Sequence, residues 1–99
     1  MKILCDFDGV ICKRTGIPTK EGLGRPMPGG LDAITLFMEL GHKVLIFTSN
    51  PKPGEVKKWL KRYHFPELQV TNIKEPCHMI IDDRAVRFTN WQDIRKYIC

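Results

Sequence analysis

The apolar positions of this chain follow two spacings that alternate along its length. Short continuous apolar runs predict strands, and the run at 44–47 is typical of a strand buried on both faces. Apolar residues three and four positions apart predict helices between these runs. The predicted strands are 2–6, 43–48, 68–71 and 78–81, and the predicted helices are 30–40 and the segment with the stripe Val56, Trp59, Leu60 and Tyr63. This alternation predicts an α/β fold, a single Rossmann-like three-layer domain with a mainly parallel sheet.

The last part of the chain carries a weaker pattern. Residues 85–88 are expected to form a short edge strand. Asn90 has the side chain of a helix N-cap, and Asp93 would place a carboxylate in the first turn of that helix. The buried face of this last helix is expected to consist of Trp91, Ile94 and Ile98.

Glycine and proline residues interrupt both spacings between residues 9 and 29. They stand at Gly16, Pro18, Gly22, Gly24, Pro26 and Pro28. We expect a loop or small flap here rather than an element of the core, and we expect the flap to lie over the rim of the sheet.

Length and composition narrow the class of protein. With 99 residues, the chain is expected to form one domain over residues 1–99. Its 42% hydrophobic and 27% charged residues are typical of a soluble globular protein. No apolar run approaches the roughly 20 residues of a membrane helix, and the first run meets Asp6 too soon for a signal peptide. We therefore expect a cytoplasmic protein with no membrane partner. The cysteines, expected to be reduced and without zinc-site spacing, are Cys5, Cys12, Cys77 and Cys99.

The net charge of +5 invites a nucleic-acid partner, but the positive residues are dispersed. Their densest cluster, at residues 57–62, lies on the polar side of a predicted helix, so a solvated helix face explains it better. A nucleic-acid partner stays open and is not favoured. The same field would also attract a phosphorylated substrate.

Acidic and small polar residues follow the ends of the predicted strands. The carboxyl ends of parallel strands form one rim, and ligands bind at that rim. The residues placed there are Asp6, Asp8, Thr48, Lys74, Asp82 and Asp83. Carboxylates at close range suit Mg²⁺, while a lysine and a hydroxyl suit phosphate oxygens. The rim therefore predicts Mg²⁺-dependent phosphate chemistry, in which a carboxylate can act as nucleophile.

Four segments resemble, in order, the motifs of the haloacid dehalogenase (HAD) superfamily. Residues 3–10 resemble the first motif, hhhDxDG[TV], and residues 43–50 are similar to the second, an apolar strand ending in Thr or Ser. Lys74, followed by Pro76, resembles the third, and residues 79–83 resemble the fourth in its DD form. The resemblance implies a HAD-like hydrolase, a phosphoric monoester phosphatase that uses Mg²⁺ and a phosphorylated substrate.

The resemblance also implies roles for the matched residues. Asp6 would be the nucleophile, and Asp8 the general acid that then serves as general base. The residues that would bind the substrate and its phosphoryl oxygens are Thr48, Ser49, Asn50 and Lys74. Those that would hold the metal are Asp6, Asp8 through its backbone carbonyl and Asp82, while Asp83 would either ligate it through water or orient the groups around it.

Two departures from the family pattern qualify these expectations. Relatives usually carry a cap domain, whereas the segment 9–29 is long enough only for a small flap, so the chain resembles the capless type. Capless relatives accept large substrates or use a neighbouring subunit as a lid, which leaves a homo-oligomer open. Many relatives have Arg where Asn50 stands, and that would change a substrate contact.

Other readings compete with a phosphatase. Receiver modules of signalling proteins also combine acidic residues, Thr, Lys and Mg²⁺, but their acceptor Asp ends the third strand, where this chain has 71–72 without Asp. A basic nucleic-acid-binding protein with a vestigial site is a third reading. Arg84 could contact a substrate, but an ion pair at the surface or behind the site explains it better. The cations of the flap, which would either grip an anionic part of a substrate or be solvated, are Lys13, Arg14, Lys20 and Arg25.

Overall fold

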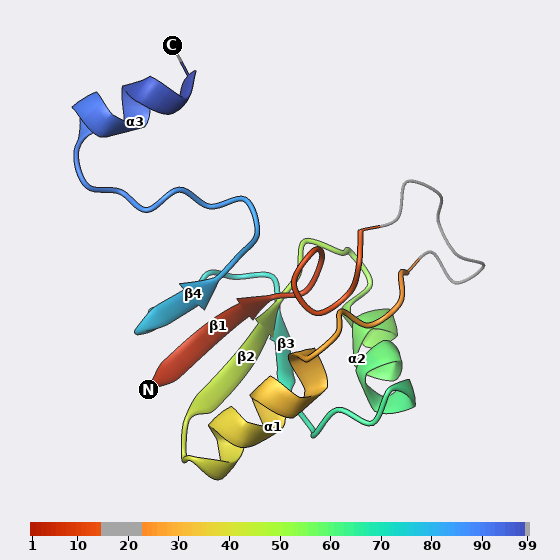
Figure 1. Ribbon diagram of the computed structural model, residues 1–99. Helices are drawn as coiled ribbons and strands as arrows, with labels where there is room; N and C mark the ends of the chain where they lie inside the picture. The colour runs from red at the N-terminus through yellow and green to blue at the C-terminus, as the bar shows by residue number, and fades with distance from the viewer. Residues whose placement is uncertain (15–22, 99) are drawn as a thin grey trace.

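A computed structural model describes residues 1–14 and 23–98 (Figure 1). The strands are β1 (Lys2–Asp6), β2 (Lys43–Phe47), β3 (Gln69–Thr71) and β4 (Met79–Ile81), and the helices are α1 (Gly30–Glu39), α2 (Pro53–Arg62) and α3 (Trp91–Ile98). These agree with the predicted elements to within one or two residues at most ends. The central part of the expected flap and Cys99 lie outside the described residues.

The four strands form one parallel sheet in the order β3-β2-β1-β4. Strand β1 lies in its interior, paired with β2 on one side and with β4 on the other. Because all four strands run the same way, their carboxyl ends meet at one edge of the sheet (Figure 1). The described structure is therefore a Rossmann-like α/β fold.

Helices α1 and α2 cover the same face of the sheet. Side chains alternate along a strand, so Ile3 and Cys5 of β1 point to one face together with their register neighbours on β2. These side chains form one buried cluster with residues of both helices, which are Ile34, Val56, Trp59 and Leu60. The helical stripe predicted from the sequence is thus the face that α2 buries.

Trp59 joins this core to the described end of the flap. Its ring meets Phe7 edge-on, with 4.9 Å between ring centroids, and it is only 3% exposed. The indole Nε1–H donates to the carbonyl of Gly24 over 2.9 Å. A buried indole needs such a partner, so this bond fixes the flap at Gly24 against α2.

The predicted third layer is not found among the described residues. No helix packs on the second face of the sheet, and the connection from β3 to β4 at 72–78 contains none. That connection contacts the second face instead, where Glu75 pairs with Lys2 at 3.4 Å. Its seven residues are too few for a crossover helix, which normally makes such a connection a dozen residues or longer.

The expectations for residues 85–98 were only partly right. Asn90 does cap α3, because its Oδ1 accepts the backbone N–H of Asp93 over 2.9 Å. The edge strand expected at 85–88 is absent, and that segment is extended coil. Helix α3 contacts no other described helix or strand, so its apolar stripe is not buried; Trp91 is 71% and Ile98 82% exposed. Periodicity identified the amphipathic face but not whether anything covers it.

Across the described part of the chain, no helix is long and apolar enough to cross a membrane.

Candidate functional site

A cavity of about 320 Å³ opens at the carboxyl edge of the sheet. Its lining comes from the ends of β1 and β2 and from the loops that follow all four strands. The lining residues are Asp6, Asp8, Arg14, Phe47, Ser49, Lys74, Asp82, Arg84 and Ala85. The sheet thus brings together most of the polar residues that the sequence placed at its rim.

Strand alternation decides which side chains enter the cavity. Cys5 and Phe7 point into the helix-covered core, so Asp6 and Asp8 point the other way. The same rule applies to β2, whose pairing continues past its end because Thr48 N–H donates to the carbonyl of Thr71 over 2.9 Å. The side chains that line the cavity therefore point to the same face of the sheet: Asp6 and Asp8 from β1, and Phe47 and Ser49 from β2.

The Thr48 side chain points to the other face of the sheet, the face of Phe7, and does not line the cavity. It is 1% exposed, and its Oγ1 accepts the backbone N–H of Asn50 over 3.1 Å. The neighbouring Ser49 lines the cavity instead. Asn50 is not among the lining residues; its Oδ1 accepts the backbone N–H of Lys52 over 2.8 Å, just before α2.

Three carboxylates lie close together at the carboxyl ends of β1 and β4. One oxygen from each of Asp6, Asp82 and Asp83 lies within 4.8 Å of the others. The carboxylate of Asp8 is not part of this group, although it lines the same cavity. Oxygen ligands at this spacing are the kind that Mg²⁺ takes.

The environment of Asp6 disfavours its charge. Partial burial, followed by the negative charge of Asp82, raises the pKa of the Asp6 carboxyl, and Asp8 and Asp83 act in the same direction. The backbone N–H of Phe7, which donates to Asp6 Oδ1 over 3.1 Å, opposes them. A cation beside Asp6 would relieve this repulsion.

Arg14 bridges two strand ends across the site. Its Nε donates to Asp83 Oδ2 over 3.0 Å, and its Nη2 donates to the backbone carbonyl of Asp8 over 3.2 Å. The hydrogen bond from Arg14 holds the pKa of Asp83 below its ordinary value. The carbonyl that the family resemblance assigns to the metal therefore already accepts one hydrogen bond, and it retains a second lone pair.

Gly9 makes this bridge sterically feasible. Its φ of +83° is in the left-handed region, and a Cβ there would collide with Asp83 Oδ2 and lie 2.7 Å from Arg14 Nε. Two local features therefore require glycine at this position of the first motif: the left-handed backbone conformation and the space that the Arg14–Asp83 ion pair occupies.

Sequence reasoning undervalued three lining residues. It left Arg14 undecided between substrate contact and solvent, expected Arg84 in an ion pair, and assigned Phe47 only to a strand. The alternation that separates Phe7 from the two aspartates would have found Phe47. No local signal indicated that Arg14 would reach Asp83, 69 positions away.

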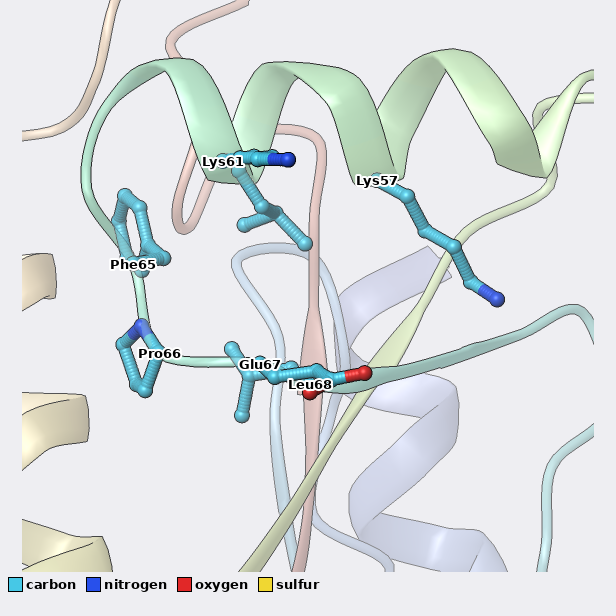
Figure 2. Close-up of a pocket in the computed structure, with 7 residues that line it drawn as sticks. Lys57, Lys61, Phe65, Pro66, Glu67 and Leu68 are labelled. Carbon is cyan, nitrogen blue, oxygen red and sulfur yellow. The ribbon is translucent and has the colours of Figure 1, made fainter.

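A second, larger cavity of about 420 Å³ lies between α2 and the segment 65–68. Figure 2 shows the Lys57 side chain reaching down from the helix, while the Lys61 side chain lies beside the helix, above the segment that carries Glu67 and Leu68. Only one carboxylate lines it, and the residues of the rim do not. Its chemistry is that of a solvated groove, so the smaller cavity is the candidate site.

A scan against protein-family models, a search of curated proteins and a search of solved structures found no match for this chain.

Proposed function

We propose that the cavity at the carboxyl edge of the sheet hydrolyses a phosphomonoester through an aspartyl-phosphate on Asp6. The observation that carries the proposal is the joint lining of one cavity by Asp6, Asp8, Ser49 and Lys74 beside a three-carboxylate group. The order of motifs resembling the HAD superfamily supports it independently.

Asp6 and Asp8 divide the chemistry between them. A carboxylate oxygen of Asp6 attacks phosphorus, the ester P–O bond breaks, and Asp8 gives its proton to the leaving oxygen. Asp8 then takes a proton from water, whose oxygen attacks phosphorus; the P–O bond to Asp6 breaks and inorganic phosphate leaves. Lys74 neutralises phosphate charge, and Ser49, rather than the buried Thr48, supplies the hydroxyl.

The carboxylate group fits a divalent cation. Asp6, Asp82 and Asp83 would hold Mg²⁺, which would offset the repulsion that raises the pKa of Asp6. When bound, the ion would neutralise charge on the phosphoryl oxygens and let a carboxylate approach phosphorus.

The test is hydrolysis of p-nitrophenyl phosphate with and without Mg²⁺. We expect Mg²⁺-dependent turnover that Asp6→Asn abolishes and Asp8→Asn lowers by about 10²–10⁴-fold. Asp32→Asn, an exposed carboxylate in the first turn of α1, is the matched control and should retain full activity. Turnover that survives Asp6→Asn, or a wild-type protein without turnover on a panel of phosphomonoesters, would overturn the proposal.

The hypothesis of a receiver-like signalling module is not supported by the residues at the end of β3. Strand β3 ends at Thr71 and is followed by Asn72, so no carboxylate stands at the end of that strand. A stable phosphoryl adduct after treatment with acetyl phosphate, without turnover, would favour that reading over the phosphatase.

A further inference from the structure

The arm formed by residues 84–98 presents an apolar surface that no other described helix or strand covers. Its extended segment and α3 project away from the sheet (Figure 1), and α3 contacts no other described element. The exposed apolar side chains of the arm are Val86, Phe88, Trp91, Tyr97 and Ile98, with exposures from 47% to 82%. Several exposed apolar side chains gathered on one segment are typical of a contact site.

The helix of this arm needs a partner. With eight residues, α3 is shorter than the roughly 12–15 residues that an isolated helix needs even to be marginal in water. Local contacts do support it: Asn90 caps it, and Phe88 packs edge-on against Trp91 at 5.4 Å between centroids. Caps and one ring contact fix its start, but its apolar stripe contributes nothing until it is covered.

The body of the same chain carries a matching unpartnered surface. Strand β4 is an edge strand that pairs only with β1 among the described strands, which leaves its outer backbone groups free. Met79 and Ile80 are 45% and 49% exposed. An edge with exposed apolar side chains accepts a further strand and an apolar cover.

The arm has the pattern that this surface accepts. Val86 and Phe88 alternate with Ala85 and Arg87, so one face of an added strand would be apolar. Helix α3 follows within three residues of Phe88 and would cover the same side.

Two contacts at the site hold the chain where the arm begins. Asp82 Oδ1 accepts the backbone N–H of Arg84 over 2.8 Å, and Arg14 holds the adjacent Asp83 from the far side of the cavity. Folding the arm back onto its own β4 would reverse the chain at these residues. A second copy offers the same acceptor without disturbing them.

We propose that two copies of this chain exchange their arms, with residues 85–98 of each copy seated on the β4 edge of the other. The arrangement is two-fold symmetric and closed, since each copy supplies one arm and one acceptor. At about 150–250 Å² per aromatic side chain, the three aromatic residues of one arm, which are 58% to 72% exposed, offer roughly 300–500 Å² of exposed surface. Two arms and two acceptors then bury on the order of 1,200–2,000 Å², the size of a stable specific interface.

The test is the mass of the full chain in solution as a function of concentration, measured by sedimentation. We expect a dimer, twice the 11.5 kDa chain mass. Ile98→Ser on the arm and Ile80→Ser on the acceptor should each raise the dimer dissociation constant by at least about tenfold. Leu40→Ser is the matched control, because Leu40 is 65% exposed at the end of α1, outside the arm and β4, and should leave the constant unchanged.

Tryptophan emission distinguishes exchange from closure on the same chain. Trp91 should shift to the blue as the dimer forms, whereas Trp59 is already buried; Trp91→Phe should remove the shift. A monomer at every concentration overturns the proposal, whether its Trp91 is blue-shifted, as in self-closure, or solvent-like. A dimer that Ile98→Ser leaves intact also overturns it, because the interface then lies elsewhere.

The effect of salt on binding distinguishes a second copy of the chain from a nucleic acid as the partner of the arm. Two basic chains repel, so added salt should leave the dimer equally stable or tighten it. Binding of the arm to a nucleic acid would weaken with salt. An arm that binds single-stranded DNA in a salt-sensitive way while the protein stays monomeric would assign the surface to that partner and overturn exchange.

Discussion

Replacing Gly9 by alanine separates backbone strain from a specific contact in the site. Gly9 and Gly41 both adopt positive φ, +83° and +87°. A non-glycine residue in this region costs roughly 1–2 kcal/mol, and stiffening the unfolded chain returns about 0.4–1 kcal/mol. From backbone strain alone, each variant should therefore lose about 1 kcal/mol, or roughly 4–8 °C in Tm for a domain of this size.

The two positions differ in what an added Cβ meets. At Gly41 nothing lies within 4 Å, whereas at Gly9 the Cβ collides with Asp83 Oδ2 and crowds Arg14 Nε. Only Gly9→Ala should therefore displace Asp83 from Arg14. The pKa of Asp83, lowered by that hydrogen bond, should rise towards its ordinary value in Gly9→Ala and stay low in Gly41→Ala.

The pH dependence of stability gives the second readout. A carboxyl whose pKa is lowered by folding stabilises the folded state above its unfolded pKa, and this stabilisation is lost as pH falls through the folded pKa. The stability gap between wild type and Gly9→Ala should therefore narrow in acid, while the gap for Gly41→Ala stays constant. Carboxyl NMR titration and urea unfolding at neutral and acid pH measure both. An unchanged Asp83 pKa in Gly9→Ala would refute the reasoning.

Three further predictions concern the side chains of Asp6, Trp59 and Cys5. Folding raises the pKa of Asp6, so this carboxyl destabilises the folded state as pH rises above its unfolded pKa. Asp6→Asn should therefore be more stable than wild type at neutral pH, and this gain should disappear in acid. Urea unfolding at both pH values measures the difference. Trp59→Phe leaves the carbonyl of Gly24 without its donor and should cost about 1–3 kcal/mol, measured by urea unfolding; a loss below about 0.5 kcal/mol would contradict it. Burial raises the pKa of Cys5 to about 12, so mass-spectrometric mapping of alkylation should find Cys77 modified in the folded protein and Cys5 only after unfolding.

The sheet and its two covering helices were readable from the sequence because their signals are local. A buried parallel strand leaves a continuous apolar run, and a helix packed on a sheet leaves a stripe, as with β2 and the stripe of α2. The convergence of Asp6 and Asp82 followed from topology, since parallel strands share an edge.

Features that depend on what covers a surface were not readable. The stripe of α3 has the same spacing as that of α2, yet Trp59 is buried and Trp91 is exposed. The bridge from Arg14 to Asp83 joins two loops whose approach no spacing encodes. The choice between Thr48 and Ser49 could have been made from strand parity, but that needs the strand to continue in register past its last apolar residue.

The place of β4 in the sheet sets how the candidate site opens. Strand β4 has three residues, one neighbour among the described strands and half-exposed side chains at Met79 and Ile80, whereas all five residues of β1 pair with β2 and three of them also pair with β4. Its amides should exchange with solvent through local fluctuations, while those of β1 exchange only when the whole domain unfolds. Asp82 and Asp83 follow this strand directly, so two of the three clustered carboxylates lie on the part of the sheet that frays first. A cation held by all three would join the least protected strand to the most protected one, and slower exchange at β4 would report its binding.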